Sequence, residues 1–204
     1  MRKVILFDLD GVLVDACEWH YVSLNRALDK HCSFEISRED HESKFNGLST
    51  RRKLEMLKIT GDTADKVWQT KQDLTWDIIR ELAKPSREKI DLHYRLILSG
   101  FRTACVTNAI RKTAELALDL TGQLEFMDFI VSNEDTENNK PHPDPYLLAF
   151  EKFGIKPEQA LIVEDSDKGM QAAIKSGAHV LRVKNSTEVT LDNVFGKIKE
   201  IWTK

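Results

Sequence analysis

Short runs of apolar residues, each ended by a polar residue, recur in two separate parts of the chain. The first run is Val4-Ile-Leu-Phe7, and Asp8 follows it at once. The others lie after residue 100, at residues 103–107, 129–131, 160–163 and 179–183. Short, continuous apolar runs are typical of strands that are buried on both faces of a sheet.

Helical spacing of apolar residues separates the later runs. The pattern predicts helices over residues 86–98, 110–120, 145–153, 168–176 and 191–202. Gly100 and Gly177 follow two of these helices, and glycine commonly ends a helix. Strands that alternate with helices form a parallel sheet with helices on both of its faces.

Only helical patterns occur between the first strand and this alternating region. They predict a helix over residues 18–28, a second that begins at Ser49 or Thr50 and is stopped by Gly61, and a third capped by Thr63. Pro85 ends the third helix, because proline cannot continue one.

These patterns together predict an α/β protein with an insertion. We expect a Rossmann-like parallel sheet core made of residues 1–15 and 85–204, with an all-helical cap domain of residues 16–84 inserted after the first strand.

Charge and composition exclude several classes of partner. The formal net charge is -3, so there is no basic excess to neutralise the phosphates of a nucleic acid. No apolar run is long enough to span a membrane, and the first one is too short for a signal peptide. The cysteines, at 17, 32 and 105, include no Cys-x-x-Cys pair, which favours free thiols in a reducing cytoplasm. We expect a cytoplasmic monomer.

Polar residues stand at the carboxyl ends of the predicted strands, where ligands bind in such sheets. Four of them are acids: Asp8, Asp10, Glu164 and Asp165. Asp8 and Asp10 are two residues apart and should project to the same side. One can attack phosphorus while the other transfers a proton, and the converging acids call for a cation.

The segment Phe7-Asp-Leu-Asp-Gly-Val-Leu-Val-Asp15 resembles the first motif of the haloacid-dehalogenase-like phosphohydrolases. The remaining motifs follow in order: Thr107 with Asn108, Lys140 within Lys-Pro-His-Pro, and Glu164-Asp165-Ser166. The place of the cap is similar to the subgroup that contains β-phosphoglucomutase and phosphoglycolate phosphatase.

The resemblance implies a role for each motif. Asp8 would be the nucleophile that forms an aspartyl-phosphate, and Asp10 would be the general acid and base. Lys140 and the Thr107 hydroxyl would spread the charge of the transferring group. Asn108 would contact the substrate.

The resemblance also implies bound Mg²⁺. The Asp8 carboxylate, the Asp10 backbone carbonyl and the Asp165 carboxylate would hold the ion, and Glu164 would hold a metal-bound water or orient a ligand.

Each motif also has an ordinary structural interpretation. Thr107 could cap the following helix, Lys140 could be a solvated loop lysine, and Glu164 and Asp165 could be acids at a helix N-terminus. All of these would have to hold together beside Asp8 and Asp10, so we prefer the catalytic interpretation.

The cap offers candidates for substrate binding. His20 resembles a histidine at the same offset in β-phosphoglucomutase, and it could equally be a surface histidine. The segment that begins at Gly47 resembles a cap segment that contacts substrate, and Arg51 lies in it, one position later than the arginine of the mutase. Arg51 could also belong to a solvated basic face.

Thr107-Asn108-Ala109 looks more like the simple phosphatases than like the serine-rich segment of the mutases. We therefore expect Mg²⁺-dependent hydrolysis of a small phosphomonoester, either a sugar phosphate or a phosphoglycolate-like compound. The alternatives are a mutase similar to β-phosphoglucomutase and a catalytically inactive module that binds a phosphorylated metabolite.

Overall fold

The computed structural model describes residues 3–45 and 48–202. The chain divides into two compact units, Met1–Asp15 with Lys84–Lys204, and Ala16–Ala83. We call the first the sheet unit and the second the helical unit, and each is described by itself. No helix in the described ranges is both long enough and apolar enough to cross a membrane.

The sheet unit contains a parallel five-stranded sheet in the order β3-β2-β1-β4-β5. Its strands are β1 (Val4–Phe7), β2 (Arg102–Val106), β3 (Ile130–Val131), β4 (Ala160–Glu164) and β5 (His179–Arg182). The parallel α/β fold predicted from the alternating patterns is therefore confirmed.

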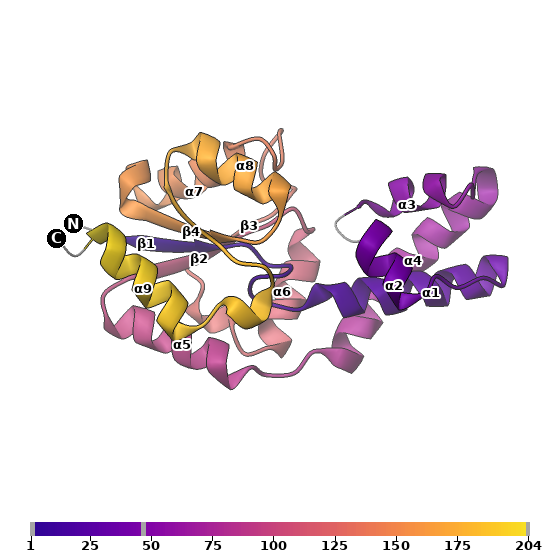
Figure 1. The fold of residues 1–204 in the computed structure, drawn as a ribbon, viewed down its shortest axis with the longest axis horizontal. Helices are drawn as coiled ribbons and strands as arrows, with labels where there is room; N and C mark the ends of the chain where they lie inside the picture. The colour runs from indigo at the N-terminus through magenta and orange to yellow at the C-terminus, as the bar shows by residue number, and fades with distance from the viewer. Residues whose placement is uncertain (1–2, 46–47, 203–204) are drawn as a thin grey trace. The chain divides into compact units, whose positions relative to one another are not determined.

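Helices cover both faces of this sheet. Figure 1 shows α7 and α8 on one face and α5 and α9 on the other. The α-helices are α5 (Arg87–Leu98), α6 (Arg111–Leu120), α7 (Asp144–Phe153), α8 (Asp167–Ser176) and α9 (Leu191–Trp202). Short 3₁₀ helices are η2 (Leu124–Phe126), η3 (Pro157–Gln159) and η4 (Ser186–Glu188).

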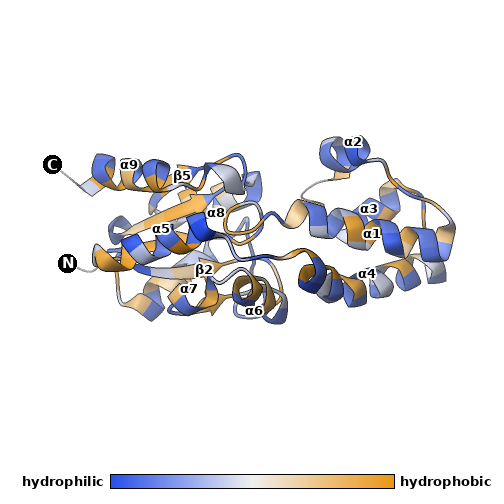
Figure 2. Ribbon diagram, turned by 90° about the horizontal axis from the view of Figure 1, so that it is seen from below, coloured by the Kyte–Doolittle hydropathy of each residue, from blue (hydrophilic) through white to orange (hydrophobic). Residues whose placement is uncertain are grey.

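Strand β1 is buried on both of its sides, which is why its sequence is continuously apolar. Val4 and Leu6 belong to the core cluster that includes Tyr146 and Phe150 of α7. Phe7 instead meets the ring of His93 in α5, with ring centroids 5.2 Å apart. Figure 2 shows hydrophobic residues in the sheet, whereas the helices around it carry many hydrophilic residues.

The order of the strands places the site. The chain runs from β1 to β2 and β3 on one side, and then crosses to β4 and β5 on the other. The reversal point therefore lies between β1 and β4, where ligands bind in sheets of this kind. Asp8 directly follows β1, and Glu164 is the last residue of β4. The backbone N–H of Asp8 donates to the carbonyl of Val163 at 3.0 Å.

The helical unit consists of helices alone in its described residues. They are α1 (Ala16–Cys32), α2 (Arg38–Asp40), the π-helix η1 (His41–Phe45), α3 (Thr50–Met56) and α4 (Gly61–Leu82). A small apolar core of its own, which includes Leu24, Leu28, Leu54 and Val67, holds these helices together.

Two predicted helix boundaries in this unit are wrong. Gly61 does not stop a helix but is the first residue of α4, and Thr60 takes the N-cap position instead of Thr63. The physical reason is the backbone of Lys58, which has a φ of 58° and ends α3 before the glycine is reached. Ser49 caps α3, and its hydroxyl accepts from the N–H of Arg52 at 3.3 Å.

Candidate active site

Lys140 joins the first motif to the last. Its ammonium group donates to Asp8 Oδ1, to Glu164 Oε1 and to the carbonyl of Val106, each at 2.6 Å. The side chain of Lys140 is 3% exposed, and these contacts use all three of its N–H donors. Lys140 is therefore not a solvated loop lysine, because it is built into the carboxyl edge of the sheet.

Both carboxylate oxygens of Glu164 accept hydrogen bonds. Its Oε1 also accepts from the Tyr146 hydroxyl at 2.7 Å, and its Oε2 accepts from the N–H of Asp165 at 3.2 Å and from Ser166 Oγ at 3.4 Å. A Cβ atom at Gly169 would overlap this carboxylate. Glu164 thus fixes the position of the Lys140 ammonium, and both oxygens of Glu164 already accept hydrogen bonds.

Tyr146 is a part of the site that the motifs did not reveal. It is fully buried on α7, and Lys140 Nζ lies 5.0 Å from the centre of its ring. Little in the sequence indicates this role, because a tyrosine on the apolar face of a helix is usually an ordinary core residue. A buried tyrosine hydroxyl nevertheless needs a partner, and here that partner is Glu164.

Burial and crowding shift the ionisation of these groups. Burial raises the pKa of Asp8 well above its ordinary value, and although Lys140 opposes the shift, Glu164 and Asp10 add to it. Burial alone would lower the pKa of Lys140, but Asp8, Tyr146 and Glu164 outweigh it and hold that pKa well above its usual range. Lys140 therefore stays charged, and the site contains more carboxylates than cationic side chains.

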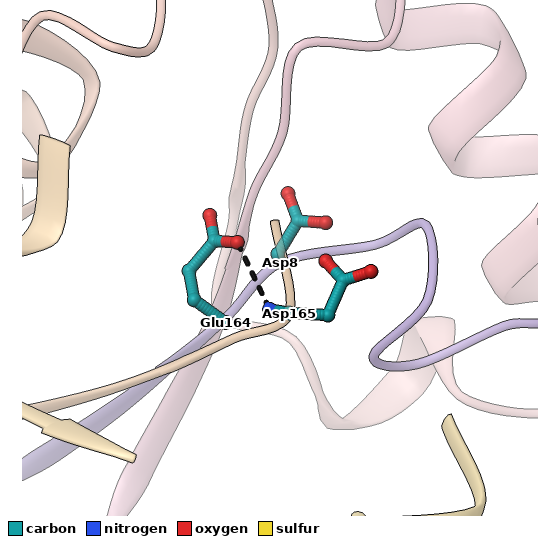
Figure 3. Close-up of side chains that lie close together, drawn as sticks. All are labelled: Asp8, Glu164 and Asp165. Atoms are coloured by element: carbon teal, nitrogen blue, oxygen red, sulfur yellow. Dashed lines mark hydrogen bonds between the residues drawn. The ribbon is translucent and has the colours of Figure 1, made fainter. Parts of the chain in front are cut away.

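The acids lie close enough together to hold a metal ion. One carboxylate oxygen from each of Asp8, Glu164 and Asp165 lies within 4.8 Å of the other two. Figure 3 shows these three side chains close together. Asp165 Oδ1 is buried and has no hydrogen-bond partner in the described part of the chain. Burial, helped by Glu164, raises the pKa of Asp165 to about 6. A cation would satisfy the orphaned oxygen and offset the excess negative charge.

The donor set fits Mg²⁺, which prefers hard oxygen ligands and commonly takes one or two carboxylates. Asp165 has an oxygen available, and Asp8 uses Oδ1 for Lys140. Glu164 has both oxygens engaged, so it fits a supporting role better than direct ligation.

Asp10 lies in a tight turn directly after β1. The N–H of Gly11 donates to the Val14 carbonyl at 2.8 Å, and the N–H groups of Leu13 and Val14 donate to the Leu9 carbonyl. Gly11 has a φ of 78°, and a Cβ atom there would overlap the Asp165 carboxylate. Glycine is therefore required for both the turn and the close approach of Asp165.

A buried glutamine donates a hydrogen bond to the backbone of this turn. Gln123 Nε2 donates to the Leu13 carbonyl at 3.1 Å, and its Oε1 lies 3.2 Å from His93 Nε2. Gln123 and His93 are both fully buried. Neither residue could be recognised from the sequence, because neither lies in a motif and an isolated polar residue does not reveal which distant residue it contacts.

Thr107 and Asn108 follow β2 at the same edge. Thr107 is buried, and its hydroxyl accepts from the N–H of Ala109 at 3.0 Å. It does not cap α6, because the N–H of Arg111 at the start of that helix bonds to Glu134 Oε2 at 2.6 Å. The structural alternative for Thr107 is therefore not observed.

Asn108 is tied to the backbone of Lys140. Its Nδ2 donates to the Lys140 carbonyl at 3.0 Å, and its Oδ1 accepts from the Lys140 N–H at 3.1 Å. This paired contact positions the loop that carries the lysine. A substrate contact by Asn108 stays a prediction.

The predicted substrate-binding residues of the helical unit differ in their surroundings. His20 Nδ1 lies 3.3 Å from Lys71 Nζ. Arg51 is about half exposed, pairs with Asp65 at 2.5 Å and lies over the ring of Trp68. Gly47 lies outside the described residues. Substrate contacts by His20, Gly47 and Arg51 stay predictions.

Comparisons with known proteins agree with this arrangement. The sequence model of the family described as haloacid dehalogenase-like hydrolase matches residues 5–183. Pyrophosphatase PpaX of Bacillus pumilus is 33% identical over 176 residues, which cover 80% of this chain and 74% of the relative.

Solved structures share the fold. A predicted phosphoglycolate phosphatase from Haemophilus somnus has a TM-score of 0.81 at 22% identity, covering 94% of this chain and 90% of that one. A β-phosphoglucomutase from Clostridium difficile has a TM-score of 0.77 at 20% identity and covers 100% of both chains. The chain is an enzyme that belongs to the haloacid dehalogenase-like hydrolase family.

Proposed function

We propose that this enzyme is a Mg²⁺-dependent phosphatase that transfers the phosphoryl group of a small substrate to Asp8 and then to water. One observation carries the proposal. The Asp8 carboxylate stands at the end of β1, is hydrogen-bonded to the buried ammonium of Lys140, and has a carboxylate oxygen of Asp165 within 4.8 Å. The site thus brings together the nucleophile Asp8, the fixed positive charge of Lys140 and, in Asp165, a ligand for a metal cation.

The first half-reaction follows from these positions. A carboxylate oxygen of Asp8 attacks phosphorus, and the bond from phosphorus to the leaving oxygen breaks. Asp10 donates a proton to that leaving oxygen. Lys140 remains charged and stabilises the negative charge of the transferring group.

The second half-reaction reverses the roles. A water molecule attacks the aspartyl-phosphate, Asp10 takes its proton, and the bond between Asp8 and phosphorus breaks to release inorganic phosphate. Asp8, the Asp10 carbonyl and Asp165 would hold Mg²⁺, with Glu164 in support. Bound Mg²⁺ would supply positive charge that offsets the repulsion between Asp8 and the phosphate.

The substrate is a small phosphorylated compound. A sugar phosphate and a phosphoglycolate-like acid are candidates, and the name of the Bacillus pumilus relative adds pyrophosphate. The fold of β-phosphoglucomutase keeps mutase activity as the second candidate. An inactive binding module is disfavoured, because such a protein has no need for a nucleophile, a buried lysine and a metal site together.

The test is phosphate release from a panel of pyrophosphate, phosphoglycolate, hexose phosphates and p-nitrophenyl phosphate, with Mg²⁺ and with a chelator. We expect Mg²⁺-dependent release that Asp8→Asn abolishes. Conversion of β-glucose 1-phosphate to glucose 6-phosphate without net phosphate release would support the mutase instead. Folded protein that binds Mg²⁺ and turns over nothing in the panel would refute the proposal.

A further inference from the structure

His93 of α5 is a core residue with an unpaired ring nitrogen. It is 0% exposed, its ring stacks on Phe126 with centroids 5.5 Å apart, and it stands edge-on to Phe7. Its Nδ1 is buried and has no hydrogen-bond partner in the described part of the chain. A buried polar atom without a partner costs free energy, and phenylalanine could make both ring contacts without that cost. Packing therefore does not explain the imidazole, which leaves its other nitrogen, Nε2.

The partner of this Nε2 is the side-chain amide of Gln123, and the neighbours of Gln123 fix which way the amide points. The Gln123 Nε2 lies 3.1 Å from the Leu13 carbonyl and 2.9 Å from Thr121 Oγ1. The carbonyl can only accept, and the Thr121 hydroxyl already donates its one proton to the Ala117 carbonyl at 2.7 Å. Both neighbours thus require the NH₂ end of the amide, so Gln123 Oε1 faces His93.

This orientation determines where the proton of the imidazole sits. Gln123 Oε1 lies 3.2 Å from His93 Nε2 and can only accept, so Nε2 carries the proton. Burial lowers the pKa of His93 to about 4, so the ring is neutral at neutral pH and has this one N–H. If the amide turned over, its oxygen would face the Leu13 carbonyl, and two acceptors would meet. The N–H of His93 therefore holds the amide in the orientation that donates to Leu13.

The Leu13 carbonyl belongs to the tight turn that follows β1. The peptide group between Leu13 and Val14 is held at both ends, because its N–H donates to the Leu9 carbonyl at 3.0 Å and its oxygen accepts from Gln123. The bond from Gln123 is buried and comes from a segment 110 positions away in the sequence. It therefore fixes the turn against the rest of the sheet unit.

Asp10 is tied to that peptide group. The Val14 carbonyl accepts from the N–H of Gly11 at 2.8 Å, and Asp10 forms a β-bridge with Val14. The Gly11 N–H and the Asp10 carbonyl belong to one peptide group, so a shift of Val14 moves the backbone of Asp10. Hydrogen bonds thus connect His93, through Gln123 and the turn, to Asp10.

We propose that His93 is a positioning residue for Asp10: its Nε2 proton fixes the Gln123 amide, which holds the turn so that Asp10 can protonate the leaving oxygen. This inference rests on the proposed function, because it takes Asp10 as the general acid. His93 touches no reacting atom, and its contribution is the geometry of the proton transfer. Protonation matters most when the leaving group is poor, so a misplaced Asp10 should slow such substrates selectively.

The first experiment compares phenyl phosphate with p-nitrophenyl phosphate in His93→Phe at saturating Mg²⁺. The two compounds are similar in shape, but p-nitrophenolate leaves with little help from an acid. Phenylalanine keeps both ring contacts and removes the N–H. We expect kcat/KM to fall roughly 10- to 100-fold for phenyl phosphate and by less than about threefold for p-nitrophenyl phosphate. This parameter reports the steps up to transfer to Asp8, so hydrolysis of the aspartyl-phosphate does not enter.

Three further variants distinguish positioning from packing. His93→Gln places an amide N–H at a similar reach from the backbone, so it should restore kcat/KM for phenyl phosphate to within about fivefold of the wild type. Leu92→Val trims a fully buried side chain of the same helix and should slow both substrates equally, if at all. Gln123→Leu should discriminate as His93→Phe does, and the double variant should be no slower than Gln123→Leu alone, because the connection is already cut.

The second experiment observes the turn without any substrate. In His93→Phe the N–H of Gly11 should exchange with deuterium at least about tenfold faster than in the wild type, because the Val14 carbonyl that it bonds to is less well fixed. In Leu92→Val the same N–H should exchange within about threefold of the wild-type rate. Thermal melts check that each variant is folded at the assay temperature.

The outcomes separate this inference from the proposed function. Equal losses for the two phosphate esters in His93→Phe, without faster exchange at Gly11, would overturn the inference and leave the phosphatase standing. Losses that multiply in the double variant would also overturn it, because His93 and Gln123 would then act independently. Faster exchange at Gly11 in His93→Phe, when the wild-type protein hydrolyses neither ester, would refute the proposed function and retain only the support of the turn by His93.

Discussion

The hydroxyl of Tyr146 offers a sharp test of how the site is held together. Tyr146→Phe removes one oxygen atom and leaves the buried ring in place beside Lys140. The lost contact is a 2.7 Å hydrogen bond to Glu164, whose side chain is 0% exposed, so no solvent can take the place of the hydroxyl. Burial raises the pKa of Tyr146 well above its ordinary value, so the wild-type hydroxyl is a neutral donor at pH 7.

The magnitude follows from the charge of the acceptor. A hydrogen bond to an ionised group contributes about 1.5–3 kcal/mol, and one kcal/mol shifts the melting temperature of a domain of this size by about 2–4 °C. We therefore expect Tyr146→Phe to lower the melting temperature by roughly 3–12 °C. Because Glu164 also positions Lys140, we expect kcat to fall about tenfold with KM little changed.

The assay is a thermal melt together with steady-state phosphate release, each with Tyr94→Phe as the control. Tyr94 is 55% exposed on α5, so its hydroxyl should contribute nothing measurable. A Tyr146→Phe protein that melts within 1 °C of the wild type and retains full kcat would refute the idea that the Glu164 network is held from α7.

Further predictions concern the nucleophile, the metal and the turn. Asp8→Asn should lower phosphate release by at least about 10³-fold while circular dichroism shows an unchanged fold, since the amide cannot act as the nucleophile; residual turnover within tenfold of the wild type would contradict this. Mg²⁺ affinity measured by calorimetry should fall as the pH drops below about 6, because Asp165 has a raised pKa of about 6 and its protonated form cannot bind the ion. Asp165→Asn should bind weakly at every pH, and an equally steep pH dependence in that variant would exclude Asp165 as its source. Gln123→Leu leaves the Leu13 carbonyl without its donor and should cost about 1–3 kcal/mol in urea denaturation and lower kcat. The exposed Gln69→Leu is its control, and equal losses in both would argue against a role for the buried glutamine.

Local patterns predicted most of the sheet unit because its strands are buried on both faces. The run from Val4 to Phe7 could be recognised without any partner, since a central strand must be apolar along its whole length. The helical unit was harder. Thr63 and Gly61 are residue types that commonly cap or end helices, but the left-handed backbone of Lys58 ends α3 before either is reached. Lysine rarely adopts a left-handed conformation, so the sequence did not predict this helix end.

The sequence by itself determined the order in which strands and helices follow one another along the chain, because this depends on the periodicity of apolar residues. It also determined that acids stand after β1 and at the end of β4, because this depends on the residue at which each apolar run stops. Tertiary structure alone decided which side chains meet. Lys140 reaches Asp8 across 132 positions of sequence and Gln123 reaches Leu13 across 110. The sequence also did not show that Lys53 is buried and Arg51 exposed, although the two lie two residues apart on one short helix. The packing of α1, α3 and α4 sets which side of that helix is covered. Contacts between distant segments depend on how the elements pack, and a single sequence does not record that packing.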